Sequence, residues 1–184
     1  MKGQWIVCFL VMTFFTVFKA NDAQAVVVNL NVLDSHIEVA ENFNVEVWVD
    51  GEGIGEELLA FGFDVSTTST VFSYLGYTIE SGFDDFSDPF NSSNVTGDVF
   101  PGIPNDDVLL ATLMFSADSA GMDVLALDGS YDGLFFGLFY EVSGVDLIAS
   151  TAIAVVASAV SEPNVFLLIC FGFFVLQQHR RLCL

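Results

Sequence analysis

Short runs of alternating apolar and polar residues, or of β-branched residues, recur through the middle of the chain. Between residues 43 and 49 the pattern is strict, because Phe43 and three valines fall on one side of an extended chain while Asn44, Glu46 and Trp48 fall on the other. This period of two residues predicts β-strands. The full set of predicted strands spans residues 26–33, 43–49, 58–65, 71–79, 108–117, 122–128, 134–142 and 145–156.

The segments between these predicted strands are rich in Gly, Asp, Asn and Pro, which are the residues that turns require. No stretch combines a sustained period of 3.6 residues with helix caps. Strands that follow one another without intervening helices favour antiparallel sheets over an α/β fold. We therefore predict an all-β domain over residues 26–156, an antiparallel β-sandwich of the jelly-roll kind.

The N-terminal residues have the three parts of a secretory signal peptide. Lys2 supplies the positive start, residues 5–18 form the apolar core, and Ala23 and Ala25 form a small-x-small cleavage site. We predict a signal peptide over residues 1–25 with cleavage after Ala25, which would place the following domain outside the cytoplasm. An uncleaved membrane anchor is the alternative.

The C-terminal residues contain a second apolar segment, at 165–176, followed by Arg180 and Arg181. As a helix, at ~1.5 Å per residue, twelve residues reach about 18 Å, which is short of the ~30 Å hydrocarbon core. Arginines after an apolar run favour a tail left in the cytoplasm. We predict a linker at 157–164 and a short transmembrane helix with a basic tail at 165–184; a buried core helix is the alternative.

The order of parts at this end resembles the PEP-CTERM sorting signal of bacterial surface proteins. Glu162 and Pro163 match the Pro-Glu-Pro motif, with Ser161 in place of the first proline, and an apolar run and Arg180-Arg181 follow. The resemblance implies processing by an exosortase at the membrane. It also implies export to the cell surface or extracellular matrix, with the C-terminus anchored transiently or stably.

Charge is distributed very unevenly along the chain. The sequence has 24 acidic and four basic residues, and no Lys or Arg lies between Val26 and Val160. So acidic a domain excludes nucleic acid and anionic lipid headgroups as its partners. The three cysteines all lie outside this domain, which therefore has neither a disulfide nor a thiolate nucleophile.

Three segments in the middle of the chain resemble the cohesin-type β-sandwich. They are "VEVWVDGEGIGEELLAFGFDVS", "VFSYLGYTIESGF" and "DDVLLATLMFSADSAGMDVLALDG", and the resemblance covers roughly Val28 to Val156. It rests on the order of the parts: a strand ending in Val-Asp, a Gly-rich acidic hairpin, and a strand with Phe61, Phe63 and Asp64. Cohesins of cellulose-degrading complexes bind dockerin modules, so the resemblance implies this fold and a dockerin-like or other surface protein as partner.

Candidate catalytic residues are few. His36 is the domain's one histidine, and its neighbours Asp34 and Ser35 point to alternate faces of an extended segment and cannot form a catalytic relay. The glycines of "GEGIG" at 51–55 lie among carboxylates that would repel phosphate, so a flexible hairpin is predicted. No catalytic residue is assigned, although a glycosidase that uses two carboxylates stays possible in chemical terms.

Residues 80–107 contain three of the four prolines and no predicted strand, and a loop this long is usually functional or disordered. One interpretation is a calcium site, because carboxylates are the ligands that Ca²⁺ prefers. A second is a stacking surface for sugars, and a third is a solvated loop held to the core by its phenylalanines. The candidate calcium ligands are Asp84, Asp85, Asp88, Asp106 and Asp107, with Asn91 and Asn105 as neutral ligands, and the candidate stacking residues are Phe83, Phe86 and Phe90, with Phe100 beside them.

The sequence thus predicts an exported, non-catalytic binding or structural module, with a polysaccharide or another surface protein as its partner. Divalent cations, calcium among them, would reduce the repulsion among its carboxylates. A secreted glycoside hydrolase and an inert spacer are the alternatives.

Overall fold

The computed structural model describes residues 26–51, 55–104 and 106–158. The predicted signal peptide with Ala23 and Ala25 lies outside these residues, as do the motif at Ser161, Glu162 and Pro163 and the tail with Arg180 and Arg181. In the described part of the chain no helix is long and apolar enough to cross a bilayer.

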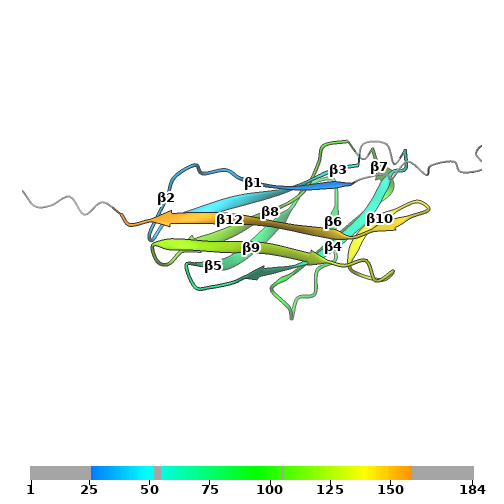
Figure 1. The fold of residues 1–184 in the computed structure, drawn as a ribbon. Helices are drawn as coiled ribbons and strands as arrows, with labels where there is room; N and C mark the ends of the chain where they lie inside the picture. Colours follow the sequence, from blue (N-terminus) through cyan, green and yellow to red (C-terminus); the bar gives the residue numbers. More distant parts are fainter. Residues whose placement is uncertain (1–25, 52–54, 105, 159–184) are drawn as a thin grey trace, which may run out of the picture.

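The described residues form two β-sheets that pack face to face (Figure 1). The smaller sheet has four antiparallel strands in the order β1-β3-β8-β5. Its strands are β1 (Val27–Val32), β3 (Asn42–Asp50), β8 (Val108–Ala117) and β5 (Phe72–Ile79). The prediction of an all-β sandwich is confirmed.

The larger sheet is built around β4 (Leu58–Thr67), which pairs with β7 (Asn94–Ile103) along one edge and with β9 (Gly121–Gly129) and β10 (Gly137–Tyr140) along the other. β12 (Leu147–Val156) follows β9 antiparallel over nine residue pairs, and it also has a short parallel pairing with β2 (Ile37–Glu38). The short strands β6 (Asp84–Asp85) and β11 (Gly144–Val145) extend β7 and β10. The predicted antiparallel arrangement holds apart from the β2–β12 contact.

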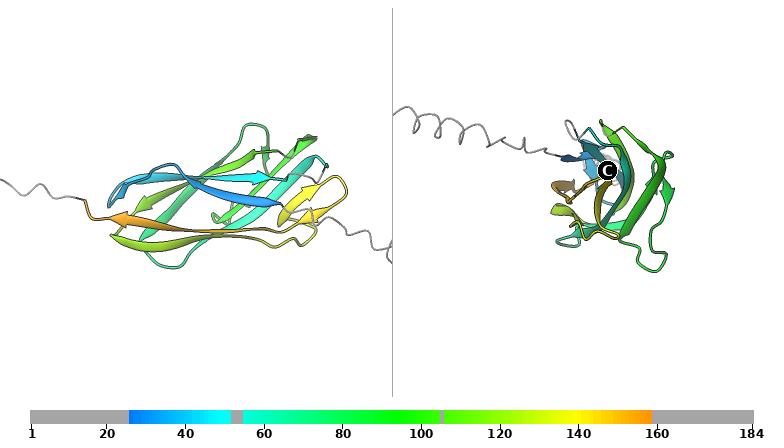
Figure 2. Two further views of the ribbon diagram at one scale, coloured as in Figure 1. Left: turned by 45° about the horizontal axis from the view of Figure 1, so that its top comes forward. Right: turned by 90° about the vertical axis from the view of Figure 1, so that its right-hand side faces the viewer.

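The end-on view in Figure 2 shows the two sheets facing each other. The core lies between them and consists of the inward side chains of the alternating strands. Three aromatic rings of the smaller sheet pack together, because Phe43 lies 5.6 Å from Phe72 and 5.4 Å from Phe115, centroid to centroid. Phe61 of β4 stacks 6.0 Å from Phe63. Burying each such ring contributes roughly 2–3 kcal/mol, so the phenylalanines supply the cohesion that a domain without cysteine needs.

The prediction of a long loop at 80–107 is wrong, because residues 94–103 form β7 along the edge of β4. Gly97 lies inside this strand, and a Cβ there would come within 2.6 Å of the Phe61 ring. Glycine is therefore required for packing at a position where a sequence pattern suggests a turn. The strand predicted at 134–142 is also shorter than expected, since only Gly137–Tyr140 pairs with β4.

β1 and β12 run in the same direction beside each other, so the described chain enters at Val26 and leaves at Ser158 at opposite ends of the sandwich (Figure 1). We call the end where β12 begins the β3–β4 end, because it contains the connection between these two strands. The opposite end contains the β8–β9 turn and the β4–β5 loop.

Asp123 is the one carboxylate in the described residues that is almost fully buried, at 2% exposure. Burial by itself would raise the pKa of Asp123, but hydrogen bonds from Thr68, Ser69 and the backbone N–H of Val124 outweigh it, so the pKa lies below its ordinary value of 3.8. The side chain thereby ties the β4–β5 loop to β9.

We expect Asp123→Ala to lower the free energy of unfolding by about 2 kcal/mol, because it leaves charged-group hydrogen bonds unmade. Since the folded pKa is depressed, the stabilisation is fully present above pH 3.8 and is lost as the pH falls through the folded value. Urea unfolding of the wild type and the variant at several pH values would measure this. Asp34→Ala, at an exposed position, is the control and should change little; equal stability of the two variants at neutral pH would contradict the role of Asp123.

Candidate interaction surface

The predicted stacking residues do not share one surface. Phe83 is buried at 8% exposure and packs edge-to-face on Phe61, with ring centroids 5.0 Å apart. The prediction that Phe83 stacks on a ligand is therefore wrong, because β6 pairs with β7 and turns this ring into the core. Phe86, Phe90 and Phe100 are exposed, at 69%, 97% and 95%.

The predicted calcium ligands are also separated. Asp84 and Asp85 lie in β6 beside Asp98 and Gly97, whereas Asp106 and Asp107 follow the far end of β7. Between these places β7 bulges, because Asp98 pairs with Ala60 whereas Ile103 pairs with Leu58. Among the residues that the structure describes, no three His, Cys, Asp or Glu side chains form a group that could hold a metal ion.

Many carboxylates instead accept hydrogen bonds from nearby backbone N–H groups. Asp85 Oδ1 accepts from the N–H of Ser87, and Asp88 Oδ1 accepts from that of Phe90, each at 2.9 Å. Such bonds satisfy a carboxylate locally and shape the turn that carries it. They take the place of counter-charges that the sequence does not supply.

Hydrogen bonds from backbone N–H groups to a carboxylate also shape the β3–β4 end. Asp132 Oδ1 accepts from the successive N–H groups of Leu134, Phe135 and Phe136 at 2.7, 2.8 and 3.1 Å, and these bonds hold the pKa of Asp132 below its ordinary value. They fold residues 132–136 into a turn, which explains why the predicted strand begins only at Gly137. Leu134 and Phe135 are left exposed, at 73% and 64%.

A glycine allows this turn to lie on β4. A Cβ on Gly62 would come within 1.8 Å of the Phe135 carbonyl oxygen, so no larger residue fits beneath the loop. Glu56 fastens the neighbouring β10–β11 hairpin, because its Oε2 accepts from the N–H groups of Val142 and Ser143, each at 3.1 Å. The end of the sandwich is thus built from carboxylates bonded to backbone.

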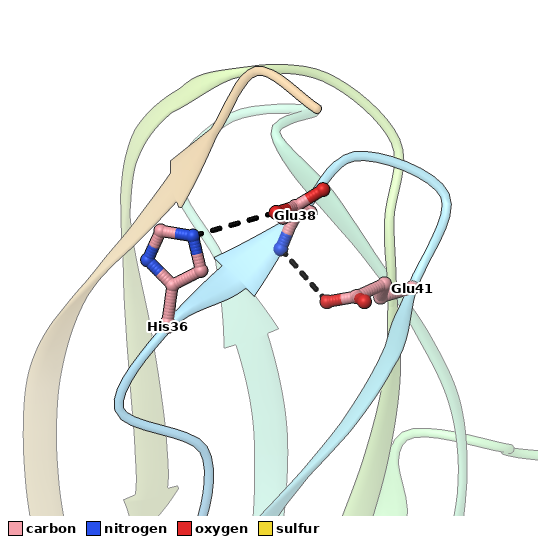
Figure 3. Close-up of polar contacts among 3 residues, drawn as sticks. All are labelled: His36, Glu38 and Glu41. Atoms are coloured by element: carbon pink, nitrogen blue, oxygen red, sulfur yellow. Dashed lines mark hydrogen bonds and ion pairs between the residues drawn. The ribbon is translucent and has the colours of Figure 1, made fainter. Parts of the chain in front are cut away.

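His36 lies at the opposite end, where it is 66% exposed (Figure 3). Its Nε2 is 3.5 Å from Glu38 Oε1, and Glu41 Oε2 accepts from the backbone N–H of Glu38 at 3.0 Å. The arrangement is that of a surface histidine beside carboxylates, as the sequence predicted.

The outer side of β9 and β12 is unusual for so acidic a chain. Every second residue pair of the β9–β12 ladder points outward, and these outward pairs carry no charge except at Asp128. The exposed fractions are 71% for Met122 and 58% for Ile148. We call this surface the β9–β12 face; its residues are Met122, Val124, Ala126, Ile148, Ser150, Ala152, Ala154 and Val156.

Carboxylates border the β9–β12 face at one end. Asp128 lies directly opposite Asp64 of β4 in the ladder, and like charges in this arrangement repel each other. Asp64 Oδ1 is buried and has no hydrogen-bond partner among the described residues. The face therefore combines an uncharged, flat centre with a negative border.

Sequence reasoning predicted β12 but missed this face. The signal was present, because the outward positions Ile148, Ala152 and Ala154 are apolar on a strand whose inward positions Leu147, Ile153 and Val155 are buried. In a sheet with one face in water the outward positions are usually polar. Apolar residues on both faces at once are therefore the pattern to look for.

Comparison with solved structures relates this arrangement to a known fold. The structure superposes on the cohesin module of a family 33 glycoside hydrolase from Clostridium perfringens with a TM-score of 0.55 at 11% identity, covering 73% of this chain and 100% of that one.

This chain has a cohesin-like fold. Further cohesins align less closely: the sixth cohesin of scaffoldin B from Acetivibrio cellulolyticus, solved with a Cel5 dockerin, gives a TM-score of 0.48 at 14% identity over 71% of this chain and 99% of that one. A cohesin–dockerin complex from Clostridium thermocellum gives 0.47 at 9% identity, with coverages of 70% and 99%. No protein-family model matches the sequence, and no curated protein does so. The cohesin-like fold predicted from the sequence is confirmed.

Because its domain has no Lys or Arg, we expect this cohesin-like protein to be stabilised by salt. Screening weakens the repulsion among surface carboxylates, so raising NaCl from 10 to 500 mM should raise the melting temperature by on the order of 5 °C. Differential scanning calorimetry would measure the change. CaCl₂ at matched ionic strength separates screening from specific binding, and a melting temperature that is independent of salt would contradict the repulsion argument.

Proposed function

We propose that this chain is a non-catalytic module that binds another protein through the β9–β12 face. Two observations support the proposal: the cohesin-like fold, and an uncharged exposed sheet surface on a chain of net charge −20. The resemblance to cohesins implies a dockerin-like module as the partner. The single observation that carries the proposal is the face itself.

The chemistry of the β9–β12 face suits a protein partner. Met122 is flexible and polarisable, and flat alanine and valine surface between the strands offers close contact without large side-chain ordering costs. A contiguous exposed apolar patch marks a candidate interaction site on a protein surface. A second copy of the chain would bring a charge of −20 with it, so a different protein is the better partner.

The carboxylates at the edge of the β9–β12 face predict the charge of the partner. Asp64 and Asp128 form a negative edge beside the apolar centre. A partner with an apolar patch and Lys or Arg at its rim would relieve their mutual repulsion and associate faster through electrostatic steering. The partner is therefore expected to be basic where it meets β4.

The alternative of a carboxylate-based hydrolase has less support. A glycosidase needs one carboxylic acid whose pKa is raised so that it can donate a proton. The two described carboxyl groups with a clear displacement, Asp123 and Asp132, both have lowered pKa values. Each accepts hydrogen bonds that stabilise the charged form, which is the wrong direction for a general acid.

Export remains part of the proposal and rests on the sequence. The predicted signal peptide would deliver the domain outside the cytoplasm, and the PEP-CTERM-like C-terminus would bring it to an exosortase. Because the chain leaves the sandwich at Ser158, at the end opposite the β3–β4 end, an anchor there would point the β3–β4 end away from the membrane. The β9–β12 face would then lie along the side of the molecule.

The binding face can be tested with a photoreactive amino acid at position 152, in the full chain in the cells that produce it. The control position is Thr78, which is exposed on β5 of the other sheet. We expect ultraviolet light to give one discrete protein adduct from position 152, with no equivalent from position 78. Mass spectrometry then identifies the partner, and Met122→Glu should reduce the adduct several-fold.

The same experiment can fail in two informative ways. Equal adducts from positions 152 and 78 would mean general proximity, and an adduct with a second copy alone would mean self-association. Either result would contradict the proposed function. Measuring turnover of a panel of glycans by the purified chain tests the hydrolase alternative directly.

Export has its own measurement. We expect surface biotinylation of intact cells to label the domain, and we expect mass spectrometry of the recovered protein to begin at Val26. A tail missing after about Pro163 would indicate processing by an exosortase. Full-length chain recovered from the cytoplasm, with both ends intact, would contradict export. This result would not bear on binding through the β9–β12 face, which the photo-adduct measures separately.

A further inference from the structure

We propose that the outer side of the smaller sheet carries a second binding site, for a neutral glycan, centred on Trp48. The inference does not depend on the β9–β12 face, which lies on the other sheet. It rests on Trp48, Glu46 and Asn31, which are adjacent on β3 and β1 and are joined by hydrogen bonds. We call these three residues, with Asn29, the Trp48 site.

Strand pairing places the members of the Trp48 site side by side. Asn29 lies opposite Trp48, and Asn31 lies opposite Glu46, across the β1–β3 ladder. All four side chains point away from the core, because the intervening residues Val45 and Val47 are fully buried. The four side chains thus lie together on the outer side of the smaller sheet, beside the bulge at which β3 shifts its register on β8.

Hydrogen bonds fix the side chains before any ligand arrives. Trp48 Nε1 donates to Glu46 Oε2 at 2.9 Å, and Asn31 Nδ2 donates to the same oxygen at 3.1 Å. The indole is therefore drawn along β3 toward Glu46, and it is half-buried rather than free to move. Preorganisation of this kind lowers the entropy cost of binding.

The chemistry of these groups matches a sugar. The apolar faces of pyranose rings pack on aromatic side chains, and amide and carboxylate groups at the edge of the ring can hydrogen-bond to hydroxyls. The exposed amides of Asn29 and Asn31 lie beside the indole, and the partly exposed Glu46 carboxylate lies between them and β3. Further along the same side of β3, Asn42 and Asn44 are exposed, so amides continue in a line that could follow a chain of sugars.

Charge determines which class of glycan fits. The four strands of this sheet contain two carboxylates, Glu46 and Asp50, and no basic residue. An anionic polysaccharide would meet Glu46 and the field of the whole domain without a single Lys or Arg to pair with. A neutral, hydroxyl-rich glycan avoids this repulsion and is therefore the ligand class that fits the site.

Affinity electrophoresis of the full chain tests the site. The gels contain a neutral polysaccharide, namely hydroxyethyl cellulose, galactomannan or xyloglucan, or an anionic one, polygalacturonate. We expect at least one neutral gel to retard the wild type and polygalacturonate not to do so. Trp48→Ala should weaken the association constant at least tenfold, and Asn31→Ala should weaken it several-fold.

The matched control is Phe90→Ala, which removes another exposed aromatic ring on a distant loop and should leave retardation unchanged. Thermal melts of all variants check folding. If Trp48→Ala does not fold, Trp48→Phe keeps a smaller ring, and its intermediate affinity would support stacking.

Three results would overturn this proposal: no retardation in any neutral gel, retardation by polygalacturonate, or equal loss in Phe90→Ala. Loss of the photo-adduct at position 152 in Trp48→Ala would also contradict two independent sites. Because the photo-adduct reports on the β9–β12 face alone, failure of the glycan site and failure of the proposed protein-binding function can be distinguished.

Discussion

A domain with many carboxylates and no Lys or Arg can satisfy these charges only with water or with its own N–H and O–H groups. The structure does this repeatedly: Asp132 takes three N–H groups, Glu56 takes two, and Asp123 takes three in addition to the Thr68 hydroxyl. All of these N–H groups except that of Val124 lie in turns and loops between the strands. The acidic side chains therefore stabilise the conformation of the turns. The same hydrogen bonds stabilise the charged form of the carboxylates.

This constraint also decides where cohesion can come from. Ion pairs cannot contribute much, since the one described pair, His36 with Glu38, is exposed and long at 3.5 Å. Cysteines are absent from the domain. What remains is apolar burial, and it is dense, because Phe43, Phe72 and Phe115 form one aromatic cluster while Phe61, Phe63 and Phe83 form another.

Most strands could be predicted from the sequence because their alternation follows from one buried and one exposed face. Residues 108–117, for example, form β8 with the predicted bounds. β7 could not be predicted in this way, because Gly97, Pro101 and Gly102 interrupt its pattern. Gly97 packs against the Phe61 ring, which lies more than thirty residues away in the sequence. The local sequence pattern around Gly97 gives no sign of such a long-range contact.

The candidate surfaces were harder to predict for a related reason. The sequence drew attention to residues 80–107 because their acidic and aromatic residues are conspicuous, yet the fold separates Asp84 from Asp107 and buries Phe83. The β9–β12 face is built from small residues that attract no notice singly. It becomes visible only when the register brings Val124 opposite Ala152 and Ile148 opposite Asp128.

The two sheets differ in the charge that they present, and this difference bears on specificity. The acidic residues gather in the loops and on the larger sheet, whereas the smaller sheet and the β9–β12 face are nearly uncharged. A chain of net charge −20 repels its own copies over a Debye length of about 8 Å at physiological salt, whatever their orientation. We therefore expect uncharged faces on such a body to meet neutral or basic partners. The same carboxylates that shape the turns would oppose self-association through the β9–β12 face.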